Sequence, residues 1–130
     1  MKIAVILARC ALGALFVLFG LNKFFQFLPM PTPPEAALAF LIAMKNTGFM
    51  MPLLGLVYIA SGALLLANLF VPLALLFLIS PLVIINLFHL FLDPSGMALG
   101  LVFLAAELFL AWAYRDSFRG VLTAKSNISL

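Results

Sequence analysis

Long apolar runs with few charges constrain this chain more than any other feature of its sequence. Residues 3–28 form one run, and the stretch 49–92 is about twice the length that one helical membrane crossing needs. Hydrophobic residues make up 67% of the 130 residues, whereas soluble domains contain about 45–50%. A soluble domain of this size could not bury so much apolar surface. The sequence therefore predicts an all-α integral membrane protein.

Turn and breaker residues divide the apolar runs into four predicted spans within one domain, residues 1–119. Pro29 ends the first run, Asn68 and Pro72 mark a break in the second, and Asp93 begins an Asp-Pro-Ser-Gly turn. The predicted spans cover residues 3–28, 51–69, 70–92 and 97–114, which gives a four-helix bundle. Residues 120–130 are polar, and we predict that they form a flexible tail.

The loop between the first two spans contains a short predicted helix, residues 33–46. Thr32-Pro33-Pro34-Glu35 matches a capping box with proline at the first helical position, and Gly48 can end the helix in the left-handed conformation. The helix would be about 20 Å long, which is too short to cross a bilayer. We expect it to lie at the membrane interface as a lid over the outer mouth of the bundle. The alternative is an amphipathic connector.

Basic residues predict how the chain is oriented in the membrane. Five of the seven basic residues lie toward the two termini: Lys2, Arg9, Arg115, Arg119 and Lys125. Four spans place both termini on one side, and basic residues favour the cytoplasmic side. We therefore predict cytoplasmic N- and C-termini. The basic residues form no stripe that could follow a phosphate backbone, so nucleic-acid binding is not expected.

Cysteine and histidine are too scarce for common redox and metal sites. Cys10 is the single cysteine, which excludes an intrachain disulfide, a CxxC pair and a cysteine-ligated metal. His89 is the single histidine, so intrinsic haem or copper ligation is not expected either. We predict no intrinsic cofactor and no metal site.

One face of the first span carries both small and charged residues. Arg9, Gly13, Phe16, Gly20 and Lys23 recur at spacings of three and four and therefore share a face. Glycines on such a face allow a neighbouring helix backbone to approach closely. The same packing role, or dimerisation, is predicted for the Gly-xxx-Gly motif that begins at residue 96.

Two buried charges are expected to meet in the cytoplasmic half of the bundle. Helical rise places Arg9 about 10 Å and Glu107 about 12 Å from the cytoplasmic ends of their spans. A lone buried charge is strongly destabilising. We therefore predict an Arg9–Glu107 ion pair, direct or through water, that joins the first and last spans.

A second polar group is expected at the outer ends of the spans. It comprises Asn22, Lys23, Tyr58, Asn86 and His89. Amide, phenol, ammonium and imidazole groups at one level suit a ligand with a carbonyl or hydroxyl head and an apolar body, such as a quinone or a lipid. The alternative is structural, with Lys23 reaching the head groups and the other side chains bonding across helices.

The order of these motifs resembles the DoxX family of small bacterial membrane proteins over essentially the whole chain. The motifs are Arg9-x3-Gly13-x6-Gly20-x2-Lys23, Gly62-Ala63-Leu64-Leu65-Leu66, Asn86-Leu87-Phe88-His89, and Glu107 with Arg115. The resemblance implies a four-helix bundle in the bacterial inner membrane, and some members serve respiratory or quinone-linked redox complexes. Relatives often carry an acidic residue at the position of Tyr58, which weakens the case for proton-coupled chemistry in this chain.

Three functions remain open from the sequence. The first is an accessory inner-membrane subunit, without autonomous activity, that binds a quinone- or lipid-like ligand in an outer-leaflet pocket and serves a redox complex. The second is a quinone-linked oxidoreductase subunit that uses Lys23 and His89. The third is an assembly or scaffold protein with only structural polar residues. The lipid bilayer is the partner common to all three, and a homo-oligomer is compatible with each.

Overall fold

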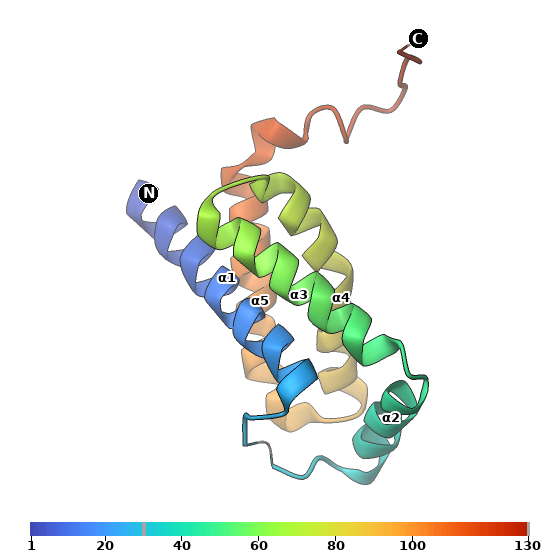
Figure 1. Cartoon of the computed structure of the whole chain (residues 1–130). Coiled ribbons are helices and arrows are strands. Elements are labelled where there is room, and N and C mark those ends of the chain that lie inside the picture. Colours follow the sequence, from blue (N-terminus) through green and yellow to red (C-terminus); the bar gives the residue numbers. More distant parts are fainter. Residues whose placement is uncertain (30, 130) are drawn as a thin grey trace.

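The computed structural model describes residues 1–29 and 31–129, and within them all regular structure is helical. The elements are α1 (Lys2–Phe25), α2 (Glu35–Asn46), α3 (Met50–Ala67), α4 (Val71–Phe91), η1 (Pro94–Gly96), α5 (Met97–Ala113) and η2 (Arg115–Phe118). Helices α1, α3, α4 and α5 lie side by side as a bundle, and the short α2 lies at one end (Figure 1). Both termini lie toward the opposite end. We call these the α2 end and the terminal end.

Among the described residues, four helices are long and apolar enough to cross a membrane. They are Lys2–Phe25, Met50–Ala67, Val71–Phe91 and Pro94–Ala113, the last including η1. Their mean hydropathies run from 1.9 to 2.5. The prediction of an all-α chain with four such helices is confirmed, and the helices suggest a multi-pass membrane protein.

Three predicted helix ends are wrong by two or three residues, one of them the end of α3, which lies at Ala67 and not at residue 69. α1 ends at Phe25 because Gln26 adopts a left-handed conformation, with φ 51°. The Asn22 side-chain oxygen then accepts a hydrogen bond from the backbone N–H of Leu28 at 2.8 Å, which holds the chain beyond the helix end. α2 begins at Glu35, and Pro34 precedes it in an extended conformation without a side-chain cap. The predicted capping box is therefore not formed.

The α2–α3 connection agrees with the prediction made for Gly48. That glycine has φ +79°, in the left-handed region, and the Thr47 hydroxyl accepts a hydrogen bond from the Met50 N–H at 3.1 Å. α2 contacts α3, and the centres of the Phe40 ring of α2 and the Phe88 ring of α4 lie 5.6 Å apart. The short helix therefore packs against α3 and α4 at the α2 end, and its role as a lid stays a prediction.

Glycines set the closest contact in the bundle, between the antiparallel helices α1 and α3. A Cβ atom on Gly13 would lie 2.8 Å from the Gly62 carbonyl oxygen, and one on Gly62 would lie 2.6 Å from the Gly13 oxygen. Gly20 and Gly55 face each other in the same way, at 2.9 and 3.1 Å. We call these four residues the glycine seam. It confirms that the glycine face of α1 receives a neighbouring backbone.

Aromatic and leucine side chains fill the centre of the bundle. The Phe16 ring lies 5.0 Å from Tyr58 and 5.9 Å from Phe103, which joins α1, α3 and α5. Leu78 and Leu82 of α4 are fully buried beside this cluster.

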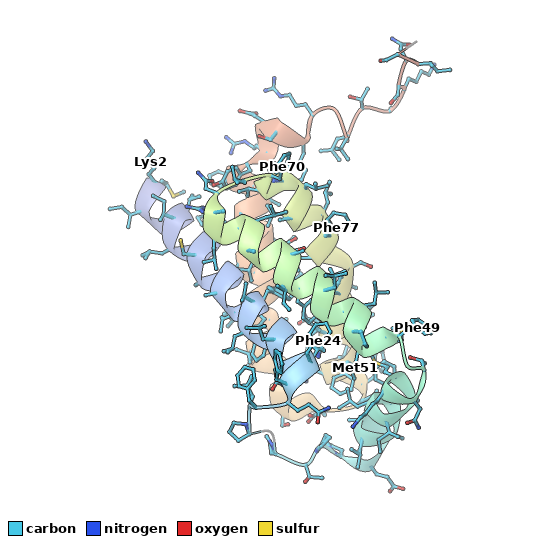
Figure 2. The ribbon with its side chains drawn as sticks, viewed as in Figure 1. Lys2, Phe24, Phe49, Met51, Phe70 and Phe77 are labelled. Carbon is cyan, nitrogen blue, oxygen red and sulfur yellow. The ribbon has the colours of Figure 1, made fainter. Side chains whose placement is uncertain are left out.

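Apolar side chains also cover the outside of the bundle. Phe24, Phe49, Phe70 and Phe77 project from its surface in Figure 2, and between 47% and 69% of each is exposed. An apolar exterior of this kind is suited to contact with lipid chains.

Candidate functional site

Lys23 and Tyr58 are brought together at the α2 end, as the sequence predicted. The Lys23 Nζ atom lies 5.6 Å from the centre of the Tyr58 ring, which is a cation–π contact. Lys23 is half-buried and Tyr58 is 5% exposed. Within residues 1–29 and 31–129, neither the ammonium nor the hydroxyl has a hydrogen-bond partner. Both donors remain available to a ligand.

Asn22 has a local structural contact instead. Its side-chain oxygen accepts the hydrogen bond from Leu28, and its backbone oxygen accepts one from the Gln26 N–H at 2.8 Å. These bonds fix the turn after α1, so the side-chain oxygen is already used.

Asn86 and His89 face α5 and the turn before it. The Asn86 side-chain N–H₂ donates to the Gly100 carbonyl at 3.0 Å and to the Leu82 carbonyl at 2.9 Å. His89 Nδ1 lies 3.1 Å from the Asp93 carbonyl oxygen. A Cβ atom on Gly96 would come within 2.2 Å of the His89 ring. The two glycines of the Gly-xxx-Gly motif therefore leave room for the side chains of Asn86 and His89 of α4, within the same chain.

The five predicted outer residues form two groups in the structure. No hydrogen bond or aromatic contact in the described part of the chain joins Lys23 or Tyr58 to Asn86 or His89. In the second group, the Asn86 side-chain N–H₂ and His89 Nδ1 contact backbone carbonyls, whereas Asn86 Oδ1 is buried without a hydrogen-bond partner among the described residues. Of the predicted ligand site, the Lys23–Tyr58 pair keeps unused donors.

Arg9 connects α1 to the end of α3. Its guanidinium Nη1 donates to the carbonyl of Leu65, and a longer bond of 3.5 Å reaches Leu66. The last carbonyls of a helix have no partner within the helix and carry partial negative charge. The buried cation therefore caps α3 from a neighbouring helix.

A direct Arg9–Glu107 ion pair is not present. The one ion pair within 4.0 Å in the described residues joins Arg119 to Asp116 at 3.1 Å on the surface. Arg9 binds α3 carbonyls because these lie next to it across the glycine seam. The water-mediated form of the pair stays a prediction.

Glu107 is the most enclosed ionisable residue of the bundle. It is 2% exposed, and its Oε2 atom is buried without a hydrogen-bond partner among the described residues. Glu107 lines a groove of about 290 Å³ between α4 and α5. Sequence reasoning found Glu107 but missed the groove, although Leu108, Ala111 and Arg115 follow at spacings that favour one side of α5.

A second cavity, of about 310 Å³, lies between α2 and α4. Its lining is entirely apolar and consists of Phe40, Ile84, Leu87, Phe88, Phe91 and Leu92. It offers no polar group to orient a ligand. No group of three or more His, Cys, Asp or Glu residues that could hold a metal ion occurs in the part of the chain that the structure describes.

Comparison of the whole chain with protein-family models, with curated proteins and with solved structures finds no match.

Proposed function

We propose that this chain is a small DoxX-like protein of the bacterial inner membrane, with cytoplasmic termini, that serves as a non-catalytic accessory subunit. It binds a small amphipathic ligand, quinone- or lipid-like, at the α2 end. Four apolar helices and an apolar exterior support the membrane location. The assignment to a redox complex rests on the family resemblance described above.

The Lys23–Tyr58 pair is the observation that carries this proposal. An ammonium and a phenol hydroxyl without hydrogen-bond partners in the described chain can both donate to a carbonyl or phosphate oxygen. The cation–π contact holds the ammonium in place while leaving its N–H groups free. Exposed Phe24 and half-buried Ile59 offer apolar surface close by on the same two helices. The pair therefore suits a polar head with an apolar body.

Thermal stability of the purified full chain tests the proposal. The probes are ubiquinone-1 for the quinone-like class and lysophosphatidylglycerol for the lipid-like class. A ligand that binds the folded state at 100 times its Kd stabilises it by about 2.7 kcal/mol, which raises the Tm. We expect at least one probe to raise the Tm of the wild type. Lys23→Met should abolish that rise.

Lys45→Met is the matched control, because Lys45 is an exposed lysine of α2. It should keep the ligand-induced rise in Tm. The proposal is wrong if neither probe raises the wild-type Tm, or if Lys23→Met responds as strongly as the wild type.

An assembly or scaffold role is the second candidate, and a separate observation favours it. Arg9, Asn22, Asn86 and His89 all bond to backbone groups of their own chain. If Lys23 is structural in the same way, Lys23→Met should lower the Tm by itself, and neither probe should change the Tm of either protein.

A further inference from the structure

A groove at the terminal end of the bundle has an apolar lining around one buried acid. It lies between α4 and α5, and Phe118 of η2 and Leu122 complete its wall. The remaining lining residues are Leu75, Leu76, Ile79, Glu107, Leu108, Ala111 and Arg115. Its volume, about 290 Å³, is near the lower end of the range of roughly 300–1,000 Å³ typical of small-molecule sites.

Glu107 lies in this groove with unmet hydrogen-bonding capacity. Only 2% of the residue is exposed, and its Oε2 atom has no hydrogen-bond partner within residues 1–29 and 31–129. Buried polar atoms are almost always hydrogen-bonded, and buried carboxylates are paired. The carboxyl group therefore has capacity for a further hydrogen-bond donor.

Among the described residues, Arg9 and Arg115 make their hydrogen bonds with groups other than Glu107. Arg9 donates to carbonyls of α3 through Nη1, and its Nε atom is buried without a hydrogen-bond partner among the described residues. Arg115 lines the groove, but its guanidinium donates to the Trp112 carbonyl at 2.9 Å and lies 4.7 Å from the centre of the Trp112 ring. Arg115 follows Glu107 by eight positions, which corresponds to about 12 Å along a helix. A donor on another molecule can therefore complete the hydrogen bonding of Glu107.

A metal ion is a poor candidate for this donor. Ca²⁺ takes about six to eight oxygen ligands, and Mg²⁺ about six. The groove supplies one carboxyl group and otherwise apolar side chains, apart from Arg115. An organic cation needs only the carboxylate and gains from the apolar walls.

The groove is accessible from the side of the bundle that we assign to lipid. Leu76 and Leu108, on its two opposing helices, are 40% and 55% exposed. Glu107 lies six residues before the end of α5, about 9 Å deeper than that end. An amphipathic molecule in the bilayer can therefore place its polar end against Glu107 and its chain along the leucines.

We infer that the α4–α5 groove binds the ammonium group of a small amphipathic amine, with Glu107 as its counter-ion and hydrogen-bond acceptor. Charge-assisted hydrogen bonds are roughly twice as strong as neutral ones, so the site selects an amine over a neutral head of equal size. The ammonium has two possible sources, an aminophospholipid head group or a free lipophilic amine. This site is distinct from the Lys23–Tyr58 pair, which attracts the opposite charge.

Binding of octylamine and of 1-octanol to the purified full chain tests this inference. The two probes share the apolar chain and differ in the head group. Equilibrium dialysis with labelled probes gives both affinities, and fluorescence of Trp112, the single tryptophan, gives a local signal beside the groove. We expect octylamine to bind about tenfold or more tightly than octanol, because of the charge-assisted bond. Equal affinity of the wild type for the two probes would overturn the inference.

Two groove variants and one control sharpen the test. Glu107→Gln keeps the shape of the side chain and removes its charge. The variant should therefore bind octylamine and octanol with about equal affinity. Ala111→Leu keeps the acid and fills the groove, so binding of both probes should weaken. Glu35→Gln changes an exposed acid of α2 and should leave the preference intact. Retention of the preference in Glu107→Gln, or unchanged binding in Ala111→Leu, contradicts the site.

Lipid composition distinguishes the two sources of the ammonium. In nanodiscs of phosphatidylcholine alone, octylamine should bind as it does in detergent. If added phosphatidylethanolamine competes with octylamine, the natural occupant is a lipid head group. If it does not compete, the occupant is a free amine. If octylamine does not bind and Glu107→Gln instead changes the mass of the solution assembly, the groove contacts a second copy of the chain and the inference is wrong.

Discussion

Buried polar side chains in this bundle mostly act on backbone carbonyls. Arg9 binds carbonyls at the end of α3, and Asn86 binds a carbonyl at the start of α5. Each contact joins two helices, and both carbonyls lie in an apolar interior where water cannot replace the lost bond. Each of these residues therefore contributes a hydrogen bond and also helps to fix how two helices are aligned along each other.

Arg9→Met should destabilise the bundle. The variant keeps an unbranched apolar stem but removes the donor to Leu65, and hydrogen bonds to charged groups contribute about 1.5–3 kcal/mol. Unfolding in mixed detergent micelles measures the change. Lys125→Met is the control, since Lys125 is exposed and no hydrogen bond or ion pair between described residues includes its side chain, and its effect should stay within about 0.5 kcal/mol. Equal effects of the two variants would show that the α3 contact does not stabilise the fold.

A double-mutant cycle tests the predicted link between Arg9 and Glu107. Because the two side chains make no direct ion pair in the structure, Arg9→Met and Glu107→Gln should be additive within about 0.5 kcal/mol. A coupling energy above about 1 kcal/mol would instead support a pair bridged by water.

Among the elements, α1 and α3 form the tightest pair. The glycine seam repeats after seven residues on both helices, so Gly13 meets Gly62 and Gly20 meets Gly55 in antiparallel order. Backbones that approach this closely gain van der Waals contact and weak Cα–H···O bonds. The seam also brings Arg9 to the end of α3 and Lys23 to Tyr58, so it positions two of the three charged residues of α1.

Gly62→Ala should destabilise the α1–α3 pair, although alanine is the better helix former by about 1 kcal/mol. Its Cβ would lie 2.6 Å from the Gly13 oxygen and 2.9 Å from the Val17 nitrogen, both backbone atoms. Overpacking of this kind costs about 1–3 kcal/mol, to be measured by the same micelle unfolding. Gly120→Ala is the control, because a Cβ there meets nothing within 4 Å. A stabilising Gly62→Ala would refute the close contact.

At the scale of the whole molecule, the two ends of the bundle differ in chemistry. The α2 end carries the Lys23 ammonium over Tyr58, whereas the terminal end carries the Glu107 carboxyl group in its groove. Between them lies a packed core of leucine and aromatic side chains. The two proposed sites should therefore respond independently to their own variants.

Cysteine labelling tests the predicted orientation of the whole chain. In a Cys10→Ser background, Glu35→Cys should react with a membrane-impermeant maleimide in intact bacterial cells. Ser126→Cys should react only after permeabilisation, because basic residues near the termini favour the cytoplasm. The reverse pattern would mean that the orientation is inverted. Labelling of both positions from outside would contradict an even number of spans.

Sequence patterns alone predicted the elements and one helix face. The lengths of the apolar runs and the breaks at Pro29, Asn68 and Asp93 gave four long helices, since these signals depend on local chain chemistry. Gly48 and the glycine face of α1 were predicted for the same reason. The end of α1 was missed because Asn22 binds the Leu28 N–H, a contact six residues away that no periodic pattern reveals.

The partners of the buried polar groups were decided only by the tertiary structure. Matching depth suggested Arg9 with Glu107, but depth does not specify which helices touch, and close packing at the glycine seam gives Arg9 the carbonyls of α3 instead. The same packing separates Lys23 and Tyr58 from Asn86 and His89. The sequence by itself determined which residues carry chemistry in an apolar bundle. Helix packing decided their contacts, because these depend on side-chain volumes from several helices at once.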